Sequence, residues 1–121
     1  MTKRPLPDYF DLSPQKRPKG KDFYFRVYEI VAMVPKGKVT SYGAIAEALG
    51  LKSGARVVGM ALGAIPEGID IAPHRVLNRI GALSAAHKFG GYRRMRRLLE
   101  AEGVTFKGEK VDLEKHFWRP E

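Results

Sequence analysis

Few side chains in this sequence could carry catalytic chemistry. Cysteine is absent, which excludes thiol catalysis, disulfides and cysteine-ligated zinc or iron–sulfur sites. His74, His87 and His116 stand far apart and form no cluster with the spacing of metal ligands. No carboxylate pair or activated serine offers a nucleophile. The residue types therefore favour binding over bond making, and we expect no metal and no cofactor.

The excess of basic residues indicates a polyanionic partner. The chain holds 22 Lys and Arg against 13 Asp and Glu, a net charge of +9. Such an excess is typical of proteins that bind nucleic acid. The alternative is a basic protein whose surface serves no specific partner, and the positions of the charges must decide between the two.

The length of 121 residues fits one domain with a modest core. We divide the chain into a basic, proline-rich tail (residues 1–21) and a domain (residues 22–121). The tail is either an arm that follows the phosphate backbone or an untethered terminus, and the sequence favours neither. No apolar run approaches the roughly 18 residues of a membrane span. We expect a monomer in the cytoplasm, with no membrane contact.

Apolar spacing predicts a first helix from Asp22 to Met33, followed by a short strand at residues 38–40. One face of that helix carries its apolar residues, which are Phe23, Val27, Ile30 and Val31, with Val34 just beyond. A helix over residues 42–49 follows, which Thr40 or Ser41 can cap. Gly50 supplies the left-handed residue that ends it.

A second short helix, over residues 54–63, completes a helix-turn-helix pattern. Ser53 can cap this helix. Its inward residues are expected to be Val57, Val58, Ala61 and Leu62. Two short helices joined by a glycine-containing turn, in a basic chain, are typical of DNA-binding proteins.

The rest of the chain predicts one more helix and a long loop. Residues 64–86 contain breakers throughout and are expected to form the loop. The helix runs over residues 92–101, with Tyr92, Met95, Leu98 and Leu99 on its apolar side, and residues 104–121 are expected to be partly extended. The fold class is therefore mainly α: a winged-helix-like, three-helix helix-turn-helix domain with a short β element and a long loop of the active-site type.

Four motifs together resemble the DNA-repair alkyltransferase family. They are Val34-Pro-Lys-Gly-Lys-Val-Thr-Ser-Tyr-Gly-Ala-Ile-Ala-Glu-Ala-Leu-Gly50, Gly54-Ala-Arg-Val-Val-Gly59, Ala72-Pro-His-Arg-Val76 and Leu98-Leu-Glu-Ala-Glu-Gly103. The family carries a proline-cysteine-histidine-arginine core, whose cysteine accepts an alkyl group from O6-alkylguanine. Pro73 stands at the cysteine position. The resemblance, which spans residues 23–103, therefore indicates the alkyltransferase-like branch, whose members bind the lesion without removing the alkyl group.

The resemblance also implies which residues contact DNA. Arg56 matches the arginine that inserts into the base stack as a finger, and Tyr42 matches the tyrosine that presses on the 3′ phosphate. Arginine suits this role because its planar guanidinium stacks on bases while keeping its charge. Without the family motif, the favoured interpretation of Arg56 would be a solvated helix residue in a surface ion pair. Ser53, Gly54, Ala55 and Gly59 complete the expected DNA-binding set, because small residues let a helix press into a groove.

A pocket for the extruded base is expected to be formed by Tyr42, Pro73, His74, Val76 and Ala86. In active relatives a histidine and a glutamate activate the cysteine, and here His74 and Glu102 stand at those positions as a retained pair. Arg75 is interpreted as structural. The family's hinge asparagine is replaced by Ile65. Small residues near the Gly81 loop predict a roomy pocket, which could accept bulkier alkyl groups.

The favoured function is non-enzymatic binding and flipping of O6-alkylguanine in double-stranded DNA. The resemblance implies that bound lesions are passed to nucleotide excision repair proteins. It also places the protein with the DNA, on the nucleoid of a bacterium or in a eukaryotic nucleus. One alternative is a helix-turn-helix regulator, which would need base-reading side chains beyond Arg56 on its second helix. Another is an enzyme that acts through His74.

Overall fold

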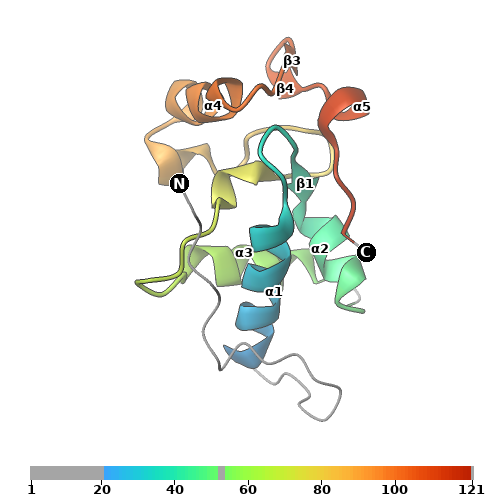
Figure 1. Cartoon of the computed structure of the whole chain (residues 1–121), viewed down its shortest axis with the longest axis vertical. Helices are drawn as coiled ribbons and strands as arrows, with labels where there is room; N and C mark the ends of the chain where they lie inside the picture. The colour runs from blue at the N-terminus through green and yellow to red at the C-terminus, as the bar shows by residue number, and fades with distance from the viewer. Residues whose placement is uncertain (1–20, 52–53, 121) are drawn as a thin grey trace.

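The computed structural model describes residues 21–51 and 54–120, and within them the fold is mainly helical, as predicted (Figure 1). The helices are α1 (Lys21–Met33), α2 (Tyr42–Ala48), α3 (Ala55–Gly63), α4 (Tyr92–Ala101) and α5 (Leu113–His116), with two 3-10 turns, η1 (Pro73–Arg75) and η2 (Ala86–Phe89). The strands are β1 (Thr40–Ser41), β2 (Val76–Leu77), β3 (Phe106–Lys107) and β4 (Lys110–Val111). The expected tail lies outside the described residues, except that Lys21 already belongs to α1.

Helices α1, α2 and α3 surround the first of two hydrophobic cores. The apolar stripe predicted for α1 is confirmed, because Val27, Ile30 and Val31 are buried in this core. Tyr28 is also fully buried, although the spacing did not place it on the stripe. Its hydroxyl donates to the carbonyl of Ala61 over 2.6 Å and thereby ties α1 to α3. Burial raises the pKa of Tyr28 to about 12, so the hydroxyl remains a donor.

The predicted helix-turn-helix is present, but the second of its helices begins with a different cap residue from the one predicted. Ser41 caps α2, because its hydroxyl accepts from the amide of Ala44 over 3.0 Å. Gly50 adopts the left-handed conformation after α2, with φ of 72°. The predicted cap of the next helix was wrong: α3 begins at Ala55 with Gly54 at the cap position and no side-chain cap bond, and Ser53 lies outside the described residues.

Parallel pairing of β1 with β2 joins the helix-turn-helix to the predicted loop. The registered pairs are Thr40 with Val76 and Ser41 with Leu77. The strand thus begins two residues later than predicted and ends one residue later. Residues 64–86 are not wholly loop, since they contain η1 and β2. Val39 also bridges Phe117 on its other side, where the amide of Trp118 donates to the carbonyl of Val39 over 2.7 Å.

Helix α4 and the β3–β4 hairpin lie at one end of the molecule, and α1, α2 and α3 lie at the other (Figure 1). Met95 and Leu99 of α4 are fully buried in the second core, as predicted. Leu98, which was also predicted on the apolar side of the helix, is 40 % exposed. The guanidinium of Arg96 donates to the carbonyl of Gly108 and lies 4.2 Å from the centre of the Phe106 ring, which holds the hairpin against α4. No helix in the described part of the chain is long and apolar enough to cross a membrane.

Gly54 has a packing role that can be tested directly. A Cβ added at Gly54 would lie 2.5 Å from the Cβ of Leu51 and 3.1 Å from that of Ala46, which are atoms that cannot rotate away. Gly54→Ala should therefore lower the free energy of unfolding by about 1–3 kcal/mol, as measured by denaturant titration. Gly59→Ala is the matched control, because no atom lies within 4 Å of its added Cβ. Equal stability of the two variants would contradict this role of Gly54.

Candidate nucleic-acid interface

One face of α3 is exposed and carries two small residues beside Arg56 and Met60. Val58 and Ala61 point into the first core, whereas Ala55, Arg56 and Met60 are exposed and Gly59 is half-buried. Arg56 makes no ion pair with any residue in the described part of the chain. The surface ion pair considered from the sequence therefore has no counterpart among these residues. A free guanidinium on a face of small side chains can reach into a groove of a duplex.

The two glycines expected at the DNA have different environments. Gly59 leaves open space beside the helix backbone, so a partner can approach closely there. Gly54 is buried, and the space beside it is filled by Leu51 and Ala46. The missing side chain at Gly54 therefore serves the turn between α2 and α3. Its expected contact with DNA stays a prediction.

Tyr42, the first residue of α2, faces the predicted pocket loop. Its hydroxyl is hydrogen-bonded to the side chain of Ser84, and its ring packs against the first core. Burial raises the pKa of Tyr42, and the Ser84 hydrogen bond offsets only part of this effect. The hydroxyl therefore stays protonated at neutral pH and can donate to a phosphate oxygen.

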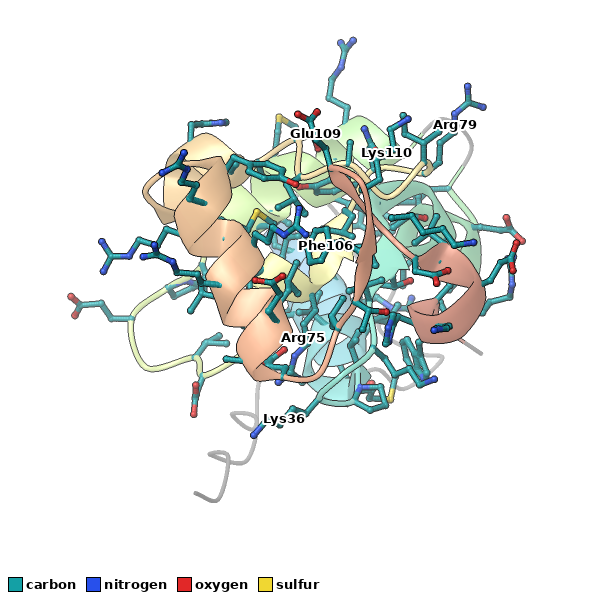
Figure 2. The ribbon with its side chains drawn as sticks, turned by 90° about the horizontal axis from the view of Figure 1, so that it is seen from above. Lys36, Arg75, Arg79, Phe106, Glu109 and Lys110 are labelled. Carbon is teal, nitrogen blue, oxygen red and sulfur yellow. The ribbon has the colours of Figure 1, made fainter. Side chains whose placement is uncertain are left out.

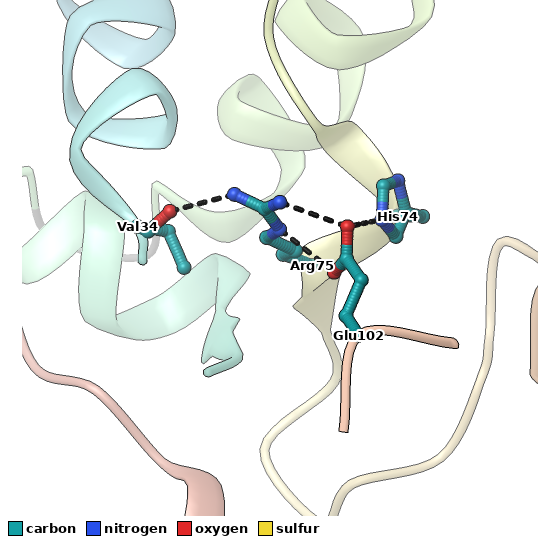
Figure 3. Close-up of polar contacts among 4 residues, drawn as sticks. All are labelled: Val34, His74, Arg75 and Glu102. Atoms are coloured by element: carbon teal, nitrogen blue, oxygen red, sulfur yellow. Dashed lines mark hydrogen bonds and ion pairs between the residues drawn. The ribbon is translucent and has the colours of Figure 1, made fainter. Parts of the chain in front are cut away.

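The Pro73–Arg75 segment forms the 3-10 turn η1, with Pro73 at its start, where the fixed φ of proline is tolerated and a missing amide costs little. Arg75, directly after His74, is buried. Its Nη1 donates to the carbonyl of Val34 over 2.8 Å, at the end of α1 (Figure 3). Its Nε and Nη2 donate to the two carboxylate oxygens of Glu102 over 2.9 and 2.8 Å. The predicted structural role of Arg75 is therefore visible in its contacts.

The structure brings together the predicted pair of His74 and Glu102. His74 Nε2 lies 3.0 Å from Glu102 Oε2 (Figure 3). Burial alone would raise the pKa of Glu102, but the hydrogen bonds from Arg75 and His74 outweigh it and hold the pKa below its ordinary value of 4.5. Because the ionised carboxylate only accepts hydrogen bonds, Nε2 must carry the proton. The pair therefore orients the imidazole next to Pro73, which offers no group to activate.

The other expected pocket residues lie around this turn. Val76 is fully buried in the first core, so its side chain cannot line an open pocket, and only its backbone could contact a base. Ala86 begins η2, and Phe89 at the end of η2 meets the His74 ring edge-on, with the centroids 6.3 Å apart. Ile65, which stands where the family carries its hinge asparagine, packs against the first core, as suits an apolar side chain.

Two residues near the pocket loop were missed from the sequence. The side-chain oxygen of Asn78 accepts from the amides of Ile80 and Ala82 over 3.1 and 2.9 Å and so shapes the loop. An asparagine ahead of a glycine is a known turn signal that could have indicated this role. Arg79 is exposed, borders a groove with Gly43, and points outward in Figure 2. It adds a positive charge beside α2.

The contribution of Glu102 to stability should depend on pH. Glu102→Gln should lower the free energy of unfolding at neutral pH by about 2–4 kcal/mol, because Arg75 then stays buried without a counter-ion. Since the folded pKa of Glu102 is lowered, its contribution is complete above 4.5 and is lost as the pH falls through the folded value. Denaturant titrations should therefore show a difference between the two proteins that shrinks in acid. A difference that does not change with pH would contradict the ion pair.

Comparison with known proteins agrees with this geometry. Residues 22–104 match the family model of the 6-O-methylguanine DNA methyltransferase, DNA binding domain. A DNA base-flipping protein of Escherichia coli is 40 % identical over 116 residues, which cover 93 % of this chain and 88 % of the relative. Alkyltransferase-like protein 1 of Schizosaccharomyces pombe is 38 % identical over 104 residues, covering 82 % of this chain and 96 % of that protein.

A solved structure shows the same fold on DNA. The crystal structure of S. pombe Atl1 in complex with damaged DNA containing O6-carboxymethylguanine superposes with a TM-score of 0.73 at 34 % identity, covering 85 % of this chain and all of that one. Sequence, fold and the arrangement around Pro73 agree, and the chain belongs to the alkyltransferase-like members of the 6-O-methylguanine DNA methyltransferase family.

Proposed function

We propose that this protein binds O6-alkylguanine in duplex DNA, rotates the damaged base out of the stack and holds it without transferring the alkyl group. The observation that carries the proposal is the exposed face of α3, where Arg56 has no ion-pair partner among the described residues and Gly59 leaves the backbone open. The names of the E. coli relative and of the S. pombe complex support both the flipping and the lesion.

Base flipping needs a close approach, a side chain that fills the gap and a pocket. The open backbone at Gly59 permits the approach. Arg56, one helical turn earlier on the same face, can fill the vacated position in the stack. Tyr42, at the start of α2 and in contact with Ser84 of the pocket loop, can press on the phosphate of the rotating nucleotide.

The chemistry of the pocket supports binding without transfer. Alkyl transfer to protein needs a nucleophile, and Pro73, at the expected position, has neither a thiol nor a hydroxyl. His74 already donates to Glu102, and the adjacent Pro73 has no thiol or hydroxyl proton that His74 could remove. The base would therefore be held by contacts alone. Such a complex, with its base extruded and its duplex distorted, offers a signal that other repair proteins can recognise.

The proposal extends to the fate of the complex. We infer that the protein acts as a monomer in the compartment that holds the DNA, on the nucleoid of a bacterium or in a eukaryotic nucleus. Nucleotide excision repair proteins are the proposed recipients of the marked lesion. The regulator considered from the sequence is disfavoured, because Ala55 and Gly59 beside Arg56 cannot read base edges.

The direct test is a titration against two duplexes that differ only by one O6-methylguanine, at one fixed salt concentration. We expect tighter binding of the lesion duplex and, by mass spectrometry afterwards, unchanged masses of protein and DNA. Equal and steeply salt-dependent binding of both duplexes would contradict the proposal and indicate a general DNA-binding protein. A methyl group found on the protein would contradict the absence of transfer.

Arg56→Ala should weaken binding of the lesion duplex by about tenfold to a hundredfold, because stacking of a side chain on a base contributes roughly 1–3 kcal/mol. Binding of the undamaged duplex should weaken much less. Arg97→Ala, an exposed arginine of α4, removes the same charge and should leave the lesion preference unchanged. Equal losses of affinity for both duplexes would indicate that Arg56 contacts only phosphate.

Gly59→Ala separates stability from DNA binding. The substitution should raise the free energy of unfolding by about 0.5–1 kcal/mol, because alanine is the better helix former and its Cβ meets no atom. It should nevertheless weaken binding of the lesion duplex, because the methyl group holds the helix away from the groove. Unchanged affinity in fluorescence anisotropy would show that the DNA does not approach α3 at Gly59.

A further inference from the structure

A positively charged groove runs along the outer side of α4, away from the second core. It has a volume of about 560 Å³ and is lined by Gly90, Arg93, Arg94, Arg97, Leu98 and Ala101. The opposite side of α4 is occupied, because Met95 and Leu99 are buried in the second core. The groove therefore belongs to a face of α4 that the fold of the described residues does not use.

The three arginines of the groove have no counter-ion among the described residues. The carboxylate of Glu100, on the same helix, is taken by Arg96 at 3.1 Å. Arg96 also donates to Tyr92 and to the hairpin, so it belongs to the packing of the fold. By contrast, Arg93, Arg94 and Arg97 are exposed and make no ion pair within residues 21–51 and 54–120.

This arrangement is unfavourable for the helix itself. Arg93 and Arg94 lie in the first turn of α4, where the helix dipole disfavours positive charge. Arg97 is four residues after Arg93 and three after Arg94, and like charges at these spacings repel one another. Charges that oppose their own helix are expected where a partner neutralises them.

The groove also has an apolar part, which distinguishes its ligand from a phosphate backbone. Leu98 is 40 % exposed, and the exposed methyl group of Ala101 lies on the same groove. Arginines beside exposed apolar side chains are typical of protein–protein contacts. A phosphate backbone would leave Leu98 without a matching surface.

The groove is separate from the DNA-binding face in the fold. Helix α4 packs on η1 and η2, and these lie between α4 and α3 (Figure 1). The groove therefore lies on a different element from the exposed face of α3. The positive charge and the exposed apolar side chains then favour one kind of partner, a protein segment that carries acidic residues and an apolar side chain.

We propose that the α4 groove docks an acidic, amphipathic segment of a partner protein, whose carboxylates pair with Arg93, Arg94 and Arg97 while an apolar side chain packs on Leu98. The inference that this partner acts on the lesion complex rests on the proposed function. The docking of the segment in the α4 groove is independent of that function.

The test uses the full chain and a labelled peptide of about 16 residues, long enough for a helix of roughly 24 Å. The peptide carries a leucine at every fourth position and glutamates at the positions between. Its matched control carries serine in place of each leucine. Fluorescence anisotropy should show tighter binding of the leucine peptide. The double variant Arg94→Glu/Arg97→Glu should weaken that binding by about tenfold or more, and Leu98→Ser should abolish the difference between the two peptides.

The charge control is Lys36→Glu/Lys110→Glu, which changes the net charge equally. Lys36 and Lys110 are both exposed, and Figure 2 shows them on other segments. This variant should keep its affinity for the leucine peptide within about twofold. Equal losses in both double variants, or equal binding of the two peptides by the unsubstituted protein, would overturn the proposal.

Duplex binding by the same variants separates the two proposals. Arg94→Glu/Arg97→Glu should keep the preference for the O6-methylguanine duplex. If undamaged duplex displaces the leucine peptide, and this variant binds that duplex about tenfold more weakly, the groove is a DNA surface and the proposal is wrong. A missing lesion preference in the unsubstituted protein would contradict the proposed function alone, because the peptide result does not depend on it.

Discussion

A buried guanidinium connects the two halves of this domain. Arg75 donates to the carbonyl of Val34, where α1 ends, and to both carboxylate oxygens of Glu102, directly after α4. A buried charge is tolerated only when its partners satisfy it fully. The three bonds therefore fix α1, η1 and the end of α4 relative to one another. The parallel pairing of β1 with β2, one residue further along the chain, then aligns the helix-turn-helix with the pocket loop.

This constraint explains why a histidine–glutamate pair persists without a nucleophile. Glu102 is the counter-ion of Arg75, so its loss would destabilise the domain whether or not a cysteine is present. His74 shares the same carboxylate and is thereby held beside Pro73. Pro73 in turn suits the first position of η1, where its ring conforms to the turn. Replacement of the reactive cysteine by Pro73 therefore requires no change in the contacts among His74, Arg75 and Glu102.

The sequence predicted the parts of the structure that depend on local patterns. The α1 stripe, the Ser41 cap and the extent of α4 followed from periodicity and capping, which act within a few residues. The packing role of Gly54 was not predicted, because its crowding by Leu51 and Ala46 arises only when α2 and α3 pack. The burial of Val76 and the exposure of Leu98 likewise depend on neighbours far apart in the chain, which spacing cannot reveal. Roles at the DNA came from the family motifs and stay predictions.

The central claim is that the lesion leaves the stack and is not altered. It is tested most directly by the fluorescence of 2-aminopurine placed next to a single O6-methylguanine in a duplex, recorded as the protein is added. Stacking quenches this base, so the account predicts a rise in fluorescence that saturates with the binding of one protein per lesion, and no rise with the undamaged duplex. Saturated, lesion-selective binding with no change in fluorescence would mean that the damaged base is recognised within the stack, and would contradict the account.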